Sequence, residues 1–261
     1  MRILLTNDDG FDAQGLRLLE RLAARLTDDV WTIAPEYEQS GASRALTLTV
    51  PVRVRQRGER SYSVAGTPTD SVRIALLDLM RSAPPDLLIS GINRGQNIGE
   101  DIALSGTVAA AIQAAMLGVR SIALSQALPG FGTDHVADWS PSTTYGADLV
   151  RSLLDSPSKL FNVNFPDCRH DQVAGIMVTR QGFNRTSCAN IDRRTDPRGN
   201  SYYWMCFHED LPCSEQGTDI AALQERYISV TPLLTDLTDH GTAATMRSIT
   251  LCTVEPREME V

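Results

Sequence analysis

Short apolar runs alternate with segments of helical periodicity over the first 165 residues, and this alternation constrains the fold more than any other feature. In the first unit an apolar run at 2–6 is followed by a polar loop, and from about residue 13 apolar side chains recur at helical spacing up to Leu26. Further strands are expected at 30–34, 46–56 (interrupted at Pro51), 62–65, 86–90, 119–125 and 161–165. Further helices are expected at about 68–80, 108–117 and 142–154. This alternation predicts an α/β protein with a mostly parallel sheet covered on both faces, a Rossmann-like three-layer sandwich.

The pattern changes after about residue 170. Strand-like segments at 173–180 and 202–207 flank a polar, arginine-bearing stretch, which predicts a hairpin-rich C-terminal extension. A short helix at 218–224 and a strand at 227–232 are expected to return to the main sheet, with a further helix at 243–252. We therefore divide the chain into a core (1–170), a hairpin extension (171–217) and a return to the core with a C-terminal tail (218–261). Because a long exposed hairpin usually has a partner, we expect the extension to serve oligomerisation.

Composition limits the class of partner and the cellular compartment. The chain has 261 residues and a net charge of −8, which argues against binding of nucleic acid polymers. No run approaches the roughly 20 apolar residues of a membrane span, and no N-terminal signal peptide is visible, so no membrane partner is expected. The five cysteines are odd in number and form no C-x-x-C pair, which favours reduced thiols and a cytoplasmic location over a disulfide framework or zinc site. A bridge between Cys206 and Cys213 is the one pairing that their spacing suggests.

Polar loops follow three of the expected strands, at 7–10, 36–43 and 90–101. In open α/β sheets ligands bind beyond the carboxyl ends of the strands, so these loops are expected to gather at one edge. The adjacent carboxylates of Asp8 and Asp9 repel each other unless a cation lies between them, which favours a hard divalent metal. Asn-Asp-Asp-Gly is also an ordinary turn sequence, because all four residues favour turns.

Two helix starts carry hydroxyl groups. Gly66-Thr67-Pro68-Thr69-Asp70 has the residues of a good N-terminal cap, and capping alone could explain this motif. Ser105-Gly106-Thr107 opens the next helix with unpaired N–H groups, hydroxyls and a favourable dipole, which it can offer to a phosphate. Taken alone, N-capping is the more common role of such a helix start.

The three loops together offer only oxygen ligands for a metal. These are the side chains of Asp8, Asp9, Ser40 and Asn93. An all-oxygen set suits magnesium, manganese or calcium rather than structural zinc.

These segments, taken together, resemble the SurE family of metal-dependent nucleotidases. The matching pieces are RILLTNDDG at 2–10, AP…QSGAS at 34–43, GTPTDSV at 66–72, SGINRGQNIGEDIALSGTVAAA at 90–111 and ISVTPL at 228–233. They cover nearly the whole chain in the family's order, and the 90–111 stretch is the most specific. The resemblance implies hydrolysis of nucleoside 5′- and 3′-monophosphates, with trimming of polyphosphate in some members. It also implies a homodimer or homotetramer.

The resemblance also implies roles for individual residues. One Mg²⁺ or Mn²⁺ per subunit would be held by Asp8, Asp9, Ser40 and Asn93, of which Asp8, Asp9 and Asn93 are the expected catalytic residues. The phosphate would be bound by Asn97, Ser105, Gly106 and Thr107. Arg44 and Arg94 are further candidates for charge neutralisation, although each also fits a surface arginine.

The chain departs from the family pattern at three places. Leu104 stands where the family commonly has tyrosine, which would alter the pocket wall, and Gln113-Ala114 replaces Glu-Gly in the following helix. Glu38 adds an acidic group before Ser40, which would weaken phosphate affinity.

Other functions remain open from the sequence. A non-catalytic metal- or nucleotide-binding regulatory module is the main alternative, although it would not need four converging ligands. A dinucleotide-dependent oxidoreductase is disfavoured because no G-x-G-x-x-G follows the first strand. A covalent aspartyl-phosphate route through Asp8 is known chemistry, but that superfamily uses D-x-D where this chain has adjacent acids. No histidine lies in a motif, so no general acid is expected from this residue type.

Overall fold

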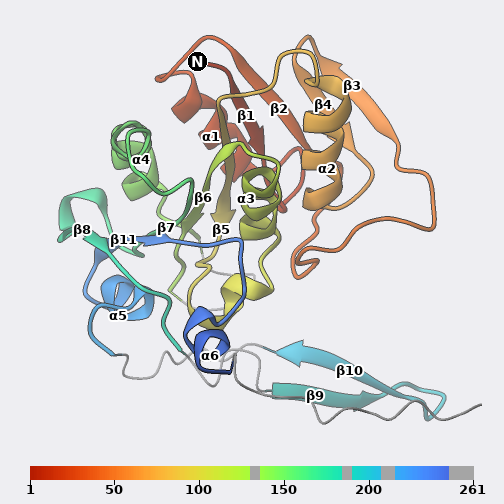
Figure 1. Cartoon of the computed structure of the whole chain (residues 1–261). Coiled ribbons are helices and arrows are strands. Elements are labelled where there is room, and N and C mark those ends of the chain that lie inside the picture. Colours follow the sequence, from red (N-terminus) through yellow and green to blue (C-terminus); the bar gives the residue numbers. More distant parts are fainter. Residues whose placement is uncertain (130–135, 184–189, 207–214, 247–261) are drawn as a thin grey trace, which may run out of the picture.

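The computed structural model describes residues 1–129, 136–183, 190–206 and 215–246. It contains a nine-stranded sheet in the order β3-β4-β2-β1-β5-β6-β7-β11-β8 and a separate two-stranded sheet (Figure 1). The strands of the main sheet are β1 (Ile3–Thr6), β2 (Val30–Pro35), β3 (Val54–Gly58), β4 (Ser61–Val64), β5 (Leu87–Arg94), β6 (Arg120–Gln126), β7 (Leu160–Phe165), β8 (Gly175–Val178) and β11 (Tyr227–Pro232).

The six central strands from β4 to β7 run parallel, and the sheet reverses direction only toward its edges. β3 pairs antiparallel with β4, and β11 pairs antiparallel with β7. The chain proceeds from β1 to β2 on one side and from β5 to β6 on the other, so the topological switch point lies between β1 and β5. Ligands of open α/β sheets bind at such a point, beyond the carboxyl ends of the strands.

Helices cover both faces of the sheet and bury two separate cores. The helical segments are α1 (Gln14–Ala23), α2 (Pro68–Ile74), the π-helical turn η1 (Ala75–Leu79), the 3₁₀ segments η2 (Gly99–Ala103) and η3 (His170–Gln172), α3 (Gly106–Met116), α4 (Ser140–Leu153), α5 (Asp219–Gln224) and α6 (His240–Thr245). α1 and α4 share one core with alternate residues of β1 and β5, and α2 and α3 share the other. Because successive strand residues point to opposite faces, Leu4 belongs to the α2/α3 core and Leu5 to the α1/α4 core. The predicted three-layer α/β sandwich is confirmed.

Two strand predictions need correction. The expected strand at 46–56 is wrong over its first part, because only residues from Val54 are paired. Its alternating apolar residues Leu48 and Val50 are exposed, so the sheet gives them no buried face. The strand expected at 86–90 is longer, because β5 continues to Arg94 after an irregularity between Ser90 and Asn93.

The C-terminal part contains the expected hairpin. β9 (Asn190–Thr195) and β10 (Ser201–Cys206) form an antiparallel pair that projects from the main body in Figure 1. β9 lies in the arginine-bearing stretch, where the sequence predicted no strand. α5 and β11 return to the core as predicted, with Ile228 and Val230 buried. Most of the helix predicted at 243–252 lies outside the described residues, and α6 ends at Thr245.

None of the helices in the described ranges is long and apolar enough to span a bilayer. Cys168 is a free thiol, and the pairing of Cys206 with Cys213 falls outside what the structure describes.

Candidate functional site

The loop after β1 is a tight turn that places two carboxylates at the switch point. The Asn7 side-chain amide donates to the carbonyl of Gly10 at 2.8 Å and closes the turn. Gly10 has a φ of +100°, and a Cβ there would lie 3.1 Å from the carbonyl carbon of Tyr37. Only glycine meets both conditions without strain. The turn therefore brings the 36–43 loop against the acidic pair, and the backbone N–H of Gln39 donates to the Asp8 carbonyl at 2.7 Å.

Asp8 is buried against the N-terminus of α3. The Thr107 hydroxyl donates to Asp8 Oδ1, and the backbone N–H groups of Gly106 and Thr107 also bond to this carboxyl group. A Cβ on Gly106 would lie 2.8 Å from Asp8 Oδ2, so glycine is needed for this close approach. Burial raises the pKa of Asp8 above its usual value, and these hydrogen bonds oppose the rise. The helix start predicted to bind phosphate thus holds the Asp8 carboxylate.

Asp9 lies in the opening of the site. The backbone N–H of Arg94 donates to Asp9 Oδ2 at 3.1 Å, which links the loop after β1 to the end of β5. Burial and the neighbouring charge of Asp8 raise the pKa of Asp9 to about 7. Two carboxyl groups this close cannot both ionise easily without a nearby cation.

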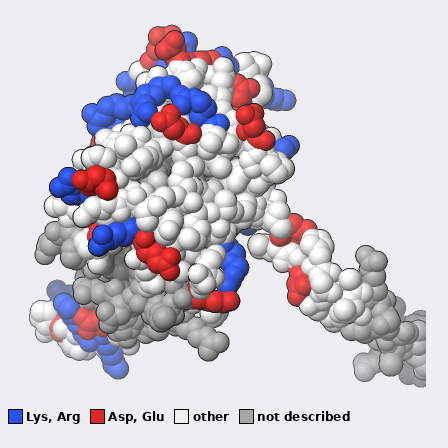
Figure 2. Space-filling view, turned by 90° about the vertical axis from the view of Figure 1, so that its left-hand side faces the viewer, with Lys and Arg blue, Asp and Glu red and all other residues white. Residues whose placement is uncertain are grey.

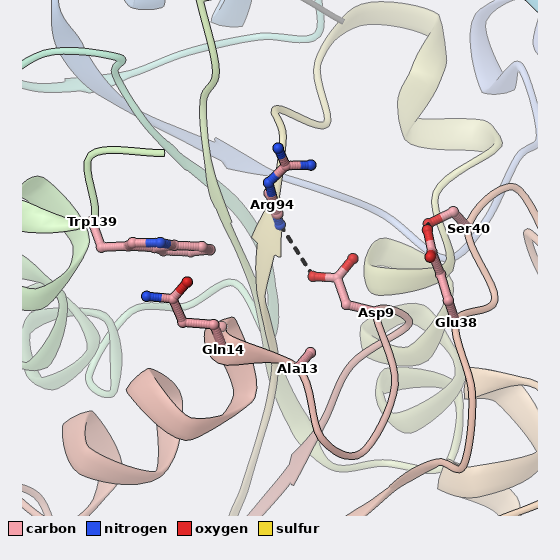
Figure 3. Close-up of a pocket in the computed structure, with 8 residues that line it drawn as sticks. Asp9, Ala13, Gln14, Glu38, Ser40, Arg94 and Trp139 are labelled. Carbon is pink, nitrogen blue, oxygen red and sulfur yellow. Dashed lines mark hydrogen bonds between the residues drawn. The ribbon is translucent and has the colours of Figure 1, made fainter. Parts of the chain in front are cut away.

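Ser40 reaches the same opening from the second loop. It is exposed, and its hydroxyl donates to Glu38 Oε1 at 3.0 Å. Together with Asp9 and Arg94, these two residues line one cavity (Figure 3). The negative charge of Glu38 also contributes to the raised pKa of Asp9.

Asn93 is half-buried near the end of β5. Its side-chain amide donates to the carbonyl of Gly95 at 2.9 Å, which leaves Oδ1 without a hydrogen-bond partner among the described residues. Asn93 follows the irregularity that separates it from Ser90, so the bend in β5 places its side chain. It lies one residue from Arg94, which contacts Asp9.

Asn97 lies in the loop between β5 and η2, and its side chain is buried. Its side-chain amide donates to the Ser125 hydroxyl at 2.8 Å, and its backbone N–H donates to Asn164 Oδ1 at 2.8 Å. Its carbonyl accepts from the amides of Asn162 at 2.7 Å and Asn164 at 3.1 Å. The side-chain amide that the sequence expected to donate to phosphate therefore anchors the loop to β6 and β7.

The remaining predicted residues lie in different surroundings. Ser105 accepts from the backbone N–H of Val108 at 3.1 Å and caps the helix, as the plain capping interpretation expected. Arg94 lines the cavity, whereas the guanidinium of Arg44 contacts the sulfur of Met116 at 3.1 Å. Leu104 is 46% exposed.

Among the described residues no three His, Cys, Asp or Glu side chains cluster as a metal site.

The donor set nevertheless fits a hard divalent cation. Asp8 and Asp9 provide adjacent carboxylates, and Ser40 and Asn93 approach from the other two loops. All four donors are oxygens, which suits Mg²⁺ or Mn²⁺. Burial and the charges of Asp8 and Glu38 raise the pKa of Asp9 more than the backbone N–H and the charge of Arg94 lower it, so a cation at this carboxyl pair would be favourable.

Sequence reasoning missed the residues that support and flank this site. Asn162 and Asn164 lie two apart in the buried strand β7 and point to the same side, beneath Asn97. The signal for these two residues is a pair of asparagines in an otherwise apolar strand. A buried amide needs hydrogen-bond partners, so such a pair indicates a polar contact inside the protein. Trp139 and Gln14 also line the cavity, and neither belongs to a recognisable motif.

Comparison with known proteins agrees with this geometry. The family model described as Survival protein SurE matches residues 3–188. A protein named 5′-nucleotidase SurE from Caulobacter vibrioides (strain NA1000 / CB15N) is 49% identical over 252 residues, covering 95% of this chain and 96% of that protein. One of the same name from Erythrobacter litoralis is 49% identical over 244 residues, covering 92% of this chain and 96% of that protein. The crystal structure of Sure protein from Aquifex aeolicus superposes with a TM-score of 0.80 at 35% identity, covering 94% of this chain and 98% of that one. The chain belongs to the SurE family.

Proposed function

We propose that this protein is a divalent-metal-dependent phosphomonoesterase that hydrolyses nucleoside 5′- and 3′-monophosphates to nucleoside and phosphate. The observation that carries the proposal is the pair Asp8 and Asp9 at the switch point, with the pKa of Asp9 raised to about 7. The relatives named 5′-nucleotidase SurE support the same activity, and nothing favours the non-catalytic binding module.

One Mg²⁺ or Mn²⁺ per subunit would be held by Asp8, Asp9, Ser40 and Asn93. When bound, such a cation polarises the phosphoryl oxygens and lowers the pKa of a bound water. The hydrogen bond from the Thr107 hydroxyl would keep the Asp8 carboxylate oriented toward the cation, because such a bond fixes the position of a metal ligand.

Asp9 is the better candidate for the proton-accepting group. Asp8 is held by the Thr107 hydroxyl and by two backbone N–H groups. Asp9 accepts the backbone N–H of Arg94 at Oδ2, and its Oδ1 would take a proton from the attacking water.

The phosphate would lie between Asp9 and the start of α3. Ser105 would donate its hydroxyl to the phosphate, and Arg94 would add positive charge from the cavity wall. Gly106 and Thr107, whose N–H and hydroxyl groups already bond to Asp8, would act on the phosphate by holding that carboxylate. Asn97 would act by holding the loop in place through β6 and β7. Asn93 would contribute to catalysis beside its role as a ligand.

We also propose that the protein forms at least a homodimer through the β9–β10 hairpin. Ile191, Tyr203, Trp204 and Met205 are each 55% or more exposed on it, which is unusual for a solitary hairpin. A cytoplasmic location and activity on polyphosphate remain predictions. On the face shown in Figure 2 acidic and basic side chains lie around a broad uncharged area. The lack of nucleic acid polymers as partners stays a prediction.

The test is phosphate release from a panel of 5′- and 3′-nucleoside monophosphates. We expect release with Mn²⁺ or Mg²⁺, loss with EDTA, and at least a hundredfold loss in folded Asp9→Asn, since the variant cannot accept the proton. Arg44→Ala is the matched control, because Arg44 contacts Met116 rather than the acidic pair. Activity of Asp9→Asn equal to that of the wild type would contradict the proposal.

A further inference from the structure

The cavity beside Asp9 has two chemically different ends. Its volume is about 200 Å³. One end carries charged and hydroxyl groups from Asp9, Glu38, Ser40 and Arg94, and the other is formed by the uncharged residues Ala13, Gln14, Gly15 and Trp139. Figure 3 shows Trp139 and Gln14 on one side of Asp9 and Ser40 and Glu38 on the other. A ligand that spans this cavity meets a polar, charged region first and an aromatic, neutral region second.

Trp139 is held in a defined position. It precedes α4, and its carbonyl accepts the backbone N–H of Thr143 at 3.0 Å. Its indole is half-buried and packs against the α1/α4 core. The ring lies over the first turn of α1, where a Cβ on Gly15 would be 3.4 Å from its Cη2 atom. The same Cβ would lie 1.9 Å from the Ile92 carbonyl oxygen, so glycine lets α1 and the indole approach β5 closely.

Gln14 provides polar groups beside this ring. It is exposed at the first position of α1, and its side-chain amide lies next to the indole in Figure 3. Neither this amide nor the Trp139 indole N–H has a hydrogen-bond partner in the described part of the chain. An amide offers both a donor and an acceptor, and an indole offers a flat apolar face with one donor.

We propose that Trp139 and Gln14 form the nucleoside subsite of this enzyme: the base of the substrate lies against the indole while its phosphate lies at Asp9 and Arg94. The inference rests on the proposed function and names the part of the substrate that the neutral end of the cavity recognises. An uncharged wall favours a neutral planar group over a second anionic group, so it distinguishes a nucleotide from a polyphosphate chain. The cavity is smaller than the about 300 Å³ at which ligand pockets usually begin, so the nucleoside is only partly enclosed. Because every base has a π-face, such a subsite tolerates different bases.

The test compares two phosphate esters that differ only in the base. We would measure kcat and KM for 5′-AMP and for ribose 5-phosphate in the wild type, Trp139→Leu, Trp139→Phe and Gln14→Ala. In Trp139→Leu the ratio of kcat/KM for AMP to that for ribose 5-phosphate should fall about tenfold to a hundredfold, the range that base–aromatic stacking supports, and chiefly through KM. Trp139→Phe should recover most of the ratio because it keeps an aromatic face. Gln14→Ala should lower it several-fold.

Trp31→Phe is the matched control. Trp31 stacks on Tyr62, with ring centroids 6.4 Å apart, and does not line the cavity. Its substitution should leave the ratio at the wild-type value. Equal losses on both substrates, or an unchanged ratio in folded Trp139→Leu and in Gln14→Ala, would overturn the subsite.

A second measurement separates this inference from the activity itself. Adenosine carries no phosphate, so its binding, followed by saturation-transfer NMR in EDTA, reports on the subsite alone. Binding by the wild type that weakens in Gln14→Ala supports the subsite even if no ester is hydrolysed. Hydrolysis of AMP by a protein that gives no transfer to adenosine would leave the phosphatase in place and overturn the subsite.

Discussion

At the scale of single residues, the burial of two adjacent carboxyl groups, Asp8 and Asp9, dominates the electrostatics of the site. Both side chains have raised pKa values, and for both the largest cause is burial. Asp8 contributes its charge to the shift of Asp9, while Arg94 offers one backbone N–H in compensation. A divalent cation would remove this unfavourable energy, so metal binding and protein stability should be coupled.

The raised pKa of Asp9 predicts that the stability of the metal-free protein depends on pH. The pKa of Asp9 in the folded state is about 7, against 3.8 in the unfolded chain, so the folded state holds this proton more tightly. The associated stability is complete below about pH 4 and is lost as the pH rises through 7. In EDTA the melting temperature of the wild type should therefore fall between pH 5.5 and pH 8 by at least about 2 °C, the shift that 1 kcal/mol produces in a chain of this size. Asp9→Asn should show a smaller fall, and an identical fall in the two proteins would contradict this origin.

The contact between Thr107 and Asp8 predicts a second residue-scale effect. Thr107→Val keeps the side-chain shape but removes the hydroxyl that donates to Asp8 Oδ1. Loss of a hydrogen bond that orients a metal ligand typically lowers metal affinity or activity by about 10–100-fold. We expect this loss in phosphate release at fixed Mn²⁺, and we expect Thr107→Ser to retain most of the activity. A fully active Thr107→Val would show that Asp8 does not need this contact.

Residue types and their places after strands indicate which residues are candidates, but they do not give the orientation of individual groups. Asp8, Asp9, Ser40 and Asn93 stay a predicted ligand set, and they lie at or beyond the carboxyl ends of the neighbouring strands β1, β2 and β5. For Asn97 the expectation of a phosphate donor was different from what the structure shows. Its side-chain amide is bonded to Ser125, and its backbone to asparagines more than 60 positions away, which no local pattern reveals.

At the scale of elements, the site depends on a segment from the far end of the chain. Asp219, at the first position of α5, accepts from the backbone N–H of Gly99 at 3.0 Å and of Gly182 at 2.7 Å. The side-chain amide of Gln181 donates to the Gly99 carbonyl at 2.8 Å. Gly99 ends the loop that follows β5 and carries Asn97, so α5 holds the C-terminal side of that loop.

Removal of the Asp219 carboxylate should therefore affect both stability and activity. Asp219→Ala leaves buried N–H groups unpaired and should lower the free energy of unfolding by about 1–3 kcal/mol, measured by urea denaturation. It should also lower kcat/KM, because the loop loses its anchor. Asp239→Ala is the control: Asp239 caps α6 through the Thr242 N–H, is exposed, and has no hydrogen bond to the loop among the described residues. Equal effects of the two substitutions would argue against a specific role for Asp219.

Elements were predictable where the apolar pattern matches burial, and not elsewhere. β1, α1 and α4 have buried faces, and the spacing of their apolar residues predicts these faces. At 46–53 the alternation is strand-like, yet Leu48 is 84% exposed and no neighbouring strand pairs with it. β9 has the opposite property, because its sequence NIDRRT is polar and, among the described residues, it pairs with β10 alone. In both cases the deciding factor is the availability of a partner strand, which local sequence does not contain.

At the scale of the whole molecule, the β9–β10 hairpin exposes apolar side chains that no part of a single chain covers among the described residues. Ile191 and Met205 are opposite each other across the β9–β10 pair and are 60% and 76% exposed. Burial of such residues by a second copy would be worth about 1.5–3 kcal/mol for each side chain. The division into 1–170, 171–217 and 218–261 also remains a prediction, although Asp219 already connects the last segment to the core.

Oligomer formation through the hairpin is tested by light scattering after size exclusion. The wild type should have at least twice the mass of the 28.5 kDa chain, and the double variant Ile191→Asp and Met205→Asp should be monomeric. Arg198→Asp, in the turn between the strands, changes the net charge equally without touching the apolar pair and should leave the mass unchanged. A wild-type monomer, or a double variant of unchanged mass, would exclude this interface.

The measurement that tests the central claim most directly is a calorimetric titration of the protein with Mn²⁺ at pH 8, where Asp9 is ionised. Three loops that converge on one cation predict a single site per chain in the wild type. Folded Asp9→Asn should bind Mn²⁺ at least tenfold more weakly, since it loses one charged ligand of the four. Absence of Mn²⁺ binding by the wild type, or equal affinity in the two proteins, would contradict a metal centre at Asp8 and Asp9.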